Sequence, residues 1–364
     1  MKQAKRRVKD DLVDGRETLR LDDLERLEMT AVQLDEARNL LDRGTVSHAR
    51  LAFILLDNAA EVIMRRNAEV ELDGNMFLER IRDRWEEILA DDPGNAEARR
   101  HLDEVQDEIV PERVRRELSR NFDASVDFIR GRGGIRETEA RVLKKLHWYR
   151  NELYHRDRLR PETIRSACLL YFDLTCALFE RLPQYELTTV SLHMETPPAL
   201  RKFNASGTVK GYPTEEQIAA SLRSDLGIDD AGLKGALSAH LTSRLDDLDA
   251  AISRVEDTLF GTLPQLAPSG PWRQVVVHLA QWTDEELPAS FDELLTANVQ
   301  YREADLTSWK QRAAGLPEVA GRLELFAAFA DIEDAFEPFE EQMTALDQRL
   351  EREIQREVDL RRGK

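Results

Sequence analysis

Apolar residues recur at steps of three and four along most of the chain, which is the spacing of one buried face of an α-helix. Few glycines or prolines interrupt the pattern. In the first half it predicts seven helices, over about 21–43, 45–68, 77–89, 95–108, 111–129, 136–154 and 161–182. We therefore expect a helical bundle over residues 21–182, preceded by a charged and flexible N-terminus over residues 1–20.

Residues 183–213 differ from this pattern, because prolines and glycines interrupt them and 186–194 is the only β-like run. They predict a linker or a small irregular element. The capping box 214-TEEQ-217 then opens a second helical domain over residues 214–364, with helices over about 214–225, 230–260, 272–282, 284–313 and 317–361. The last of these has heptad-like spacing, which is typical of a helical hairpin or a short coiled coil. The predicted fold class is all-α.

Charge is unevenly distributed along the chain. The net charge is −18, of which −4 falls on residues 1–182 (34 basic against 38 acidic) and −14 on residues 183–364 (18 against 32). Residues 130–160 nevertheless hold ten basic and four acidic side chains, a local charge of +6. Such a basic island favours a single site for an anionic ligand over a general nucleic-acid coat. A solvated helix face gives the same pattern.

Location and redox state follow from what the sequence lacks. No stretch approaches the ~20 apolar residues of a membrane helix, and no apolar segment of a signal peptide follows the basic start MKQAKRRVKDD. Cys168 and Cys176 are eight residues apart on one predicted helix, about 12 Å, which is too far for a disulfide. We expect a cytoplasmic protein without membrane contact, in which both cysteines pack in the core.

Motifs for metal, nucleotide or nucleophile chemistry are missing from the sequence. We therefore expect no metal and no cofactor, and chemistry that depends on ordinary acid–base side chains. Of the seven histidines, only His147 and His155 lie in the basic island. Its segment 146-LHWYRNELYHRDRLRP-161 places Arg150, Asn151 and His155 in the pattern R-N-x-x-x-H.

This pattern, at the end of one predicted helix and ahead of an apolar helix, resembles the motif of the HEPN superfamily, over residues 20–182. HEPN domains are small all-α bundles, and many are metal-independent endoribonucleases with an Arg, a polar residue and a His in this order. Two further pairs, Arg43 with His48 and Arg141 with His147, have Gly or Val after the arginine and do not fit. Residues 183–364 show no resemblance.

The resemblance implies an endoribonuclease, acting as a toxin or anti-phage effector on cellular RNA such as tRNA and leaving 2′,3′-cyclic phosphate and 5′-OH ends. Histidine transfers protons near neutral pH, and arginine stabilises a charged phosphate. We assign catalysis to Arg150, Asn151 and His155. Candidate RNA contacts are their basic and aromatic neighbours, Lys144, Lys145, His147, Tyr154, Arg156, Arg158 and Arg160. Some HEPN toxins are silenced at a tyrosine whose position is Asp157 here, so that control is not expected.

Arg150 and His155 do not share a helix face, since five positions place them about 140° apart around the axis. Either the chain bends near Tyr154, or two chains build the site. HEPN nucleases use the second arrangement, so we expect a homodimer, and an antitoxin or sensor partner that binds the acidic second half. Both residues lie outside the apolar stripes. Alanine at either is therefore expected to abolish cleavage with little change in stability.

Other interpretations stay open. The protein could be a non-catalytic HEPN-like scaffold whose second half binds proteins, or a module that binds RNA or nucleotides without turnover. His155 would then be a surface histidine at a helix C-terminus, where a cation is favoured. Arg150 would be an ion-pair partner of Glu152 or Glu139. The acidic half is either an assembly arm or an inhibitor that covers the basic island.

Overall fold

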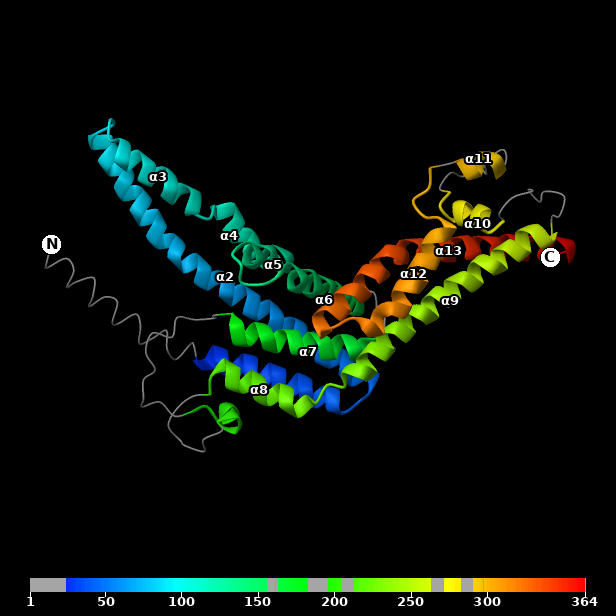
Figure 1. The fold of residues 1–364 in the computed structure, drawn as a ribbon, viewed down its shortest axis with the longest axis horizontal. Coiled ribbons are helices and arrows are strands. Elements are labelled where there is room, and N and C mark those ends of the chain that lie inside the picture. Colours follow the sequence, from blue (N-terminus) through cyan, green and yellow to red (C-terminus); the bar gives the residue numbers. More distant parts are fainter. Residues whose placement is uncertain are drawn as a thin grey trace. The chain divides into compact units, whose positions relative to one another are not determined.

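The computed structural model describes residues 24–155, 161, 163–182, 196–204, 213–262, 272–282, 291–296 and 298–363. Every regular element in these ranges is a helix, so the predicted all-α class is confirmed. The chain divides into two compact units, residues 1–228 and 229–364 (Figure 1). The division follows α8 (Glu215–Leu226) rather than preceding residue 214, because α8 packs on α7 (Ile164–Arg181).

The first unit is built around the long helix α2 (Val46–Asp91). Gly44, with φ of 73°, ends the preceding helix over 24–42, and the Thr45 side chain caps α2 by accepting from the His48 N–H. The predicted helices over 45–68 and 77–89 are one continuous helix. The residues between them contain no proline and one glycine, Gly74, so nothing there stops the helix.

The second half of α2 packs against α3 (Ala96–Glu108), which Asn95 caps (Figure 1). The single helix predicted over 111–129 is wrong, because two helices, α4 (Glu112–Leu118) and α5 (Phe122–Gly131), occupy it. The Asn121 side chain accepts from the Ala124 N–H and so begins a new helix at this point.

The core of this unit lies between α2, α5, α6 (Glu137–His155) and α7. Its largest fully buried side chains are aromatic: Phe53, Tyr171, Phe172 and Phe179. Cys168 and Cys176 are both buried and free on α7, as expected for apolar packing. A short 3-10 helix, η1 (Pro198–Phe203), and α8 follow. The β-like run over 186–194 lies outside the described residues.

The second unit contains α9 (Asp230–Thr262), α10 (Trp272–Ala280), α11 (Phe291–Thr296), α12 (Glu303–Gly315), η3 (Leu316–Glu318) and α13 (Arg322–Arg361). The predicted helix over 284–313 is therefore not continuous, since residues 298–302 separate α11 from α12. None of the helices in the described ranges has the length and apolarity needed to cross a membrane.

Helices α9 and α13 pack side by side and run in the same direction. Ion-paired residues on the two helices are offset by 92, 96 and 93 positions along α9, at Asp230–Arg322, Arg244–Glu340 and Arg254–Asp347. A nearly constant offset means that α9 and α13 form a parallel pair, while α12, which η3 joins to α13, also packs on α13. The apolar seam of α13 is buried through Leu346, whereas Ile354 is 43 % exposed.

Candidate acid–base site

Helix α6 is fixed to the bundle at both of its ends. At its start the buried carboxylate of Glu139 accepts from the backbone N–H of Arg136 and pairs with Arg181 of α7 at 2.9 Å. At its end Arg50 of α2 donates to the carbonyl of Leu153 at 3.0 Å. This contact joins α2 to the last described turn of α6. The R-N-x-x-x-H segment therefore has a defined position against α2.

Arg150 has a fixed side chain in this segment. Its Nη1 donates to Asn151 Oδ1 at 3.0 Å. Its Nε lies 3.1 Å from Asp57 Oδ2 of α2, close enough for an ion pair although the two groups are not aligned for a hydrogen bond. The sequence suggested Glu152 or Glu139 as the partner, and it did not suggest Asp57, which the structure places in contact with Arg150. Asp57 is completely buried, whereas the Arg150 side chain is 27 % exposed.

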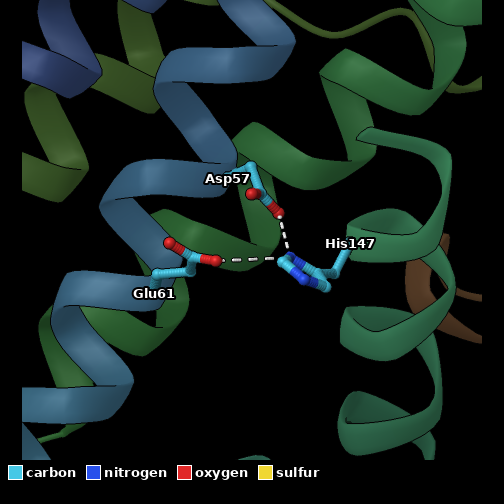
Figure 2. Close-up of side chains that lie close together, drawn as sticks. All are labelled: Asp57, Glu61 and His147. Atoms are coloured by element: carbon cyan, nitrogen blue, oxygen red, sulfur yellow. Dashed lines mark hydrogen bonds and ion pairs between the residues drawn. The ribbon is translucent and has the colours of Figure 1, made fainter. Parts of the chain in front are cut away.

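Asp57 binds two more side chains through its other oxygen. Oδ1 lies 3.0 Å from Nδ1 of His147 on α6 and accepts from the hydroxyl of Tyr171 on α7 at 2.8 Å. Glu61, one turn further along α2, has its Oε1 3.6 Å from the same histidine nitrogen (Figure 2). Phe122, the first residue of α5, covers the imidazole with ring centroids 4.5 Å apart. Asp57 thus ties α2, α6 and α7 together.

The charge of Asp57 determines how its neighbours titrate. A carboxylate only accepts, so Nδ1 of His147 carries a proton and Nε2 is the nitrogen that exchanges one. Burial alone would lower the pKa of His147, but the hydrogen bond to Asp57 and its negative charge raise the pKa above the ordinary value. Burial and Asp57 also raise the pKa of Glu61, and that of the Tyr171 phenol rises well above its ordinary range. His147 is therefore a proton-exchanging group on a fixed carboxylate.

The same cluster contains the only set of metal-binding side chains found in the described ranges. One ligand atom each from Asp57, Glu61 and His147 lies within 4.8 Å of the other two. These residues could hold a divalent cation, with two carboxylate oxygens and one imidazole nitrogen. Arg150 and Tyr171 already bind the Asp57 carboxylate, so a cation would compete with them. The sequence gave no motif for this set, because its ligands come from two helices far apart in the chain.

The lysines predicted to contact RNA have partners within the protein. Lys144 pairs with Asp127 at 2.7 Å and keeps 31 % of its side chain exposed. Lys145 is nearly buried, and its ammonium lies 4.4 Å from the ring centroid of Trp148 and 5.1 Å from that of Tyr149. This cation–π contact occupies Lys145. Of the two, Lys144 is the better candidate for a phosphate contact.

The rest of the predicted site lies at or beyond the end of α6. Helix α6 extends through His155, and residues 156–160, where the chain would bend after Tyr154, lie outside the described residues. Helical geometry then places positions 150 and 155 about 140° apart around one axis. The side chains of Tyr154 and His155 lie outside the described residues, as do Arg156, Arg158 and Arg160 entirely.

The expectation that alanine at Arg150 would leave stability unchanged conflicts with this geometry. Arg150 is an ion-pair partner of a carboxylate with no exposure to water. Removing one partner of a buried pair leaves the other charge uncompensated, which typically costs about 3–5 kcal/mol. Lysine is therefore the better replacement at position 150, because it keeps the charge and removes the planar guanidinium.

Sequence reasoning missed Asp57 and its partner Tyr171. A usable signal was present, because Asp57 lies among the apolar positions of its helix, one turn after Phe53 and three residues before Ala60. A charged residue on a buried face is uncommon unless it is paired. His147 was named only as an RNA contact, and its spacing of three from Arg150 could have placed both side chains on one face.

Known proteins give no further guide to this site. No family model, no curated protein and no solved structure matches the chain. The resemblance to HEPN domains therefore depends on the motif at Arg150, Asn151 and His155 and on the helical bundle around it.

Proposed function

We propose that this protein is a metal-independent endoribonuclease of HEPN type that cleaves cellular RNA as a toxin or anti-phage effector. One observation carries the proposal: the motif arginine, Arg150, is held by the buried Asp57 beside the proton-exchanging imidazole of His147, at the end of α6. A fixed guanidinium next to an acid–base group is what phosphodiester cleavage without a metal requires.

The reaction divides among these side chains by their chemistry. A histidine takes the proton from the 2′-OH, and the oxygen attacks the adjacent phosphorus. Arg150 stabilises the charge on the pentavalent phosphate through its guanidinium. A second histidine protonates the leaving 5′-oxygen. His155 and His147 are the two candidates for these roles, and the products are a 2′,3′-cyclic phosphate and a 5′-OH.

The site is proposed to be composite. Positions 150 and 155 lie on different sides of α6, so one chain offers its arginine and the partner chain its histidine across a two-fold axis. A nuclease that attacks cellular RNA also needs control. We assign that control to an antitoxin or sensor partner that binds the acidic second half, residues 183–364, with its charge of −14.

Cleavage of a mixed RNA pool by the purified full chain tests the activity. The native protein is expected to release 2′,3′-cyclic phosphate ends, and His155→Ala and Arg150→Lys are expected to release almost none. His101→Ala is the matched control, because His101 lies on α3 and pairs with Glu97 and Glu104 outside the site. Equal cleavage by native protein and His155→Ala would remove the assignment.

Mixing inactive chains tests the composite site. Arg150→Lys chains mixed with His155→Ala chains form heterodimers in half of all pairings, and each heterodimer has one intact centre out of two. The mixture should recover about a quarter of the native activity. A monomer that cleaves RNA at the native rate would contradict the dimer.

A non-catalytic scaffold is the second candidate, and one contact favours it. The Arg150 side chain already binds Asp57 and Asn151 of its own chain, as a purely structural arginine would. This alternative predicts that the native protein cleaves no RNA and that Arg150→Lys changes only stability. The cleavage assay therefore separates the two functions directly.

A further inference from the structure

A groove of about 330 Å³ lies on α4, outside the cluster around Asp57. Its lining is mostly basic and consists of Arg113, Arg116, Glu117, Arg120 and Asn121. All five are exposed to solvent. None of these residues belongs to the basic island over 130–160, so the groove is a separate positive feature on an acidic chain.

The three arginines of the groove share one face of the chain. Arg113 and Arg116, three residues apart, share one face of α4, and Arg120, just beyond the end of the helix, lines the same groove. Arg116 lies 3.6 Å from Glu112, an exposed pair that contributes little. Neither Arg113 nor Arg120 pairs with an acidic side chain in the part of the chain that the structure describes.

Arg115 behaves differently and shows what fixes the groove. It turns to α2 and pairs with Glu79 at 2.8 Å. Nearby, the Asn75 side chain of α2 accepts from the Val110 N–H at 2.7 Å. These contacts hold the start of α4 against α2. Arg115 therefore anchors the helix, while Arg113 and Arg116 of α4 and Arg120 beyond its end remain at the surface.

The groove adjoins the acid–base site through the chain itself. Asn121 lines the groove, and the ring of the next residue, Phe122, lies against the imidazole of His147 at a tilt. Consecutive Cα atoms are about 3.8 Å apart. A polyanion lying along α4 would therefore reach the edge of the His147 cluster at Phe122.

We infer that this groove binds the phosphates of a single-stranded RNA that extends from the acid–base site, an inference that rests on the proposed function. Guanidinium groups bind phosphate oxygens with two parallel hydrogen bonds. With Glu117 counted, the lining carries a net charge of +2, and its openness suits a strand that passes through rather than an enclosed small molecule. Arg113, Arg116 and Arg120 are then phosphate-binding residues outside the catalytic centre.

Binding of a fluorescent single-stranded RNA to the full chain over a series of salt concentrations tests the inference. The RNA carries 2′-O-methyl groups, so it has no 2′-OH to attack and cannot be cleaved. Combined Arg113→Gln, Arg116→Gln and Arg120→Gln should weaken binding at least about tenfold. The slope of log affinity against log salt should fall by about 2, because each lost phosphate contact to a single strand contributes about 0.7.

A matched control is available on α13. Arg349, Arg352 and Arg356 have the same spacing and are also exposed. Their replacement by glutamine removes the same net charge and should leave the affinity and the slope nearly unchanged. If both triple variants weakened RNA binding equally, the groove inference would be overturned, since the overall positive charge would then explain the binding. Both variants should have the same thermal unfolding midpoint as the native protein, which verifies that they are folded.

Two outcomes separate this inference from the proposed function. If the native protein binds RNA through the three arginines but cleaves none, the groove is supported and the nuclease function is contradicted. If the native protein cleaves RNA and the groove variant binds RNA with native affinity, only the groove inference is contradicted. Poly-glutamate that displaces the RNA more strongly than unlabelled RNA of equal charge would assign the groove to an acidic polypeptide and overturn the inference.

Discussion

Each unit of this protein contains a carboxylate that is completely buried and paired with an arginine. In the first unit Asp57 contacts Arg150, His147 and Tyr171. In the second unit Glu333 of α13 pairs with Arg244 of α9 at 2.6 Å. The exposures of the two arginines are similar, at 27 % for Arg150 and 18 % for Arg244.

The partners of these two pairs differ in kind. Arg244 also binds Glu340 through Nε at 3.2 Å, approaches Glu337, and lies over the ring of Phe336 at 4.8 Å. These acids and this aromatic ring all lie on α13, so the network cross-links α9 and α13. The Asp57 cluster instead contains an imidazole with a raised pKa and an asparagine on the arginine. Burial of a charge alone therefore does not distinguish the two clusters, and the imidazole is the feature that sets the Asp57 cluster apart.

The largest expected difference between the two clusters is in activity. His155→Ala and Arg150→Lys should each lower RNA cleavage by about 10²–10⁴-fold, the usual effect of removing an acid–base or charge-stabilising group. Arg244→Lys in the second unit should leave cleavage within about twofold of native. Initial rates on one labelled RNA measure all three. A loss of cleavage by Arg244→Lys as large as that of Arg150→Lys would erase the comparison.

In stability the two clusters should behave alike. Arg150→Ala and Arg244→Ala each remove the arginine from a fully buried carboxylate, which should lower the free energy of unfolding by about 3–5 kcal/mol. Each variant should affect the unfolding transition of its own unit, so urea titrations followed by circular dichroism are analysed as two transitions. Removing the acid as well, with Asp57→Asn in the Arg150→Ala chain, should restore part of the loss. A change below about 1 kcal/mol in either alanine variant would show that its carboxylate is hydrated.

Much of the fold could be predicted because helices leave local signals. Thr45, Asn95 and the capping box at Thr214 begin the helices where the sequence placed them. The errors lie where local signals are weak. Helix α2 continues through Gly74, where two helices were predicted, and Asn121 starts a new helix where the apolar spacing predicted a single continuous helix. The direction of α13 relative to α9 depends on long-range packing, which periodicity does not contain.

The candidate site was only partly predictable for the same reason. The motif around Arg150 is a local pattern, so the sequence alone could reveal it. His147 lies in the same segment and was also named from the sequence. Asp57 and Tyr171 join it only through the packing of three helices, and the chain separates Asp57 from His147 by 90 positions. Lys145 shows the opposite error, because its charge counted toward the basic island although it lies on Trp148.

A smaller effect concerns the pH dependence of stability. Asp57 raises the pKa of His147, so the folded state binds a proton more tightly than the unfolded state, whose histidine titrates near 6.5. The stabilisation is fully present below about pH 6.5 and is lost as pH rises through the folded value. The difference in unfolding free energy between native protein and His147→Gln should be about 1–3 kcal/mol at pH 6 and should shrink toward pH 9. A difference that grows with pH would mean that His147 is neutral in the folded protein.

The smallest expected effect is that of chelation. The proposed reaction uses only side chains, and Arg150 and Tyr171 already occupy the carboxylate that a cation at Asp57, Glu61 and His147 would need. Dialysis against EDTA should therefore leave the cleavage rate within error of the untreated protein. Glu61→Gln, which removes one of the three ligands and no member of the proposed reaction, should likewise keep its activity. If EDTA abolished cleavage, one divalent cation restored it and Glu61→Gln prevented that rescue, the cluster would be a metal centre and the comparison with Arg244 would need a different basis.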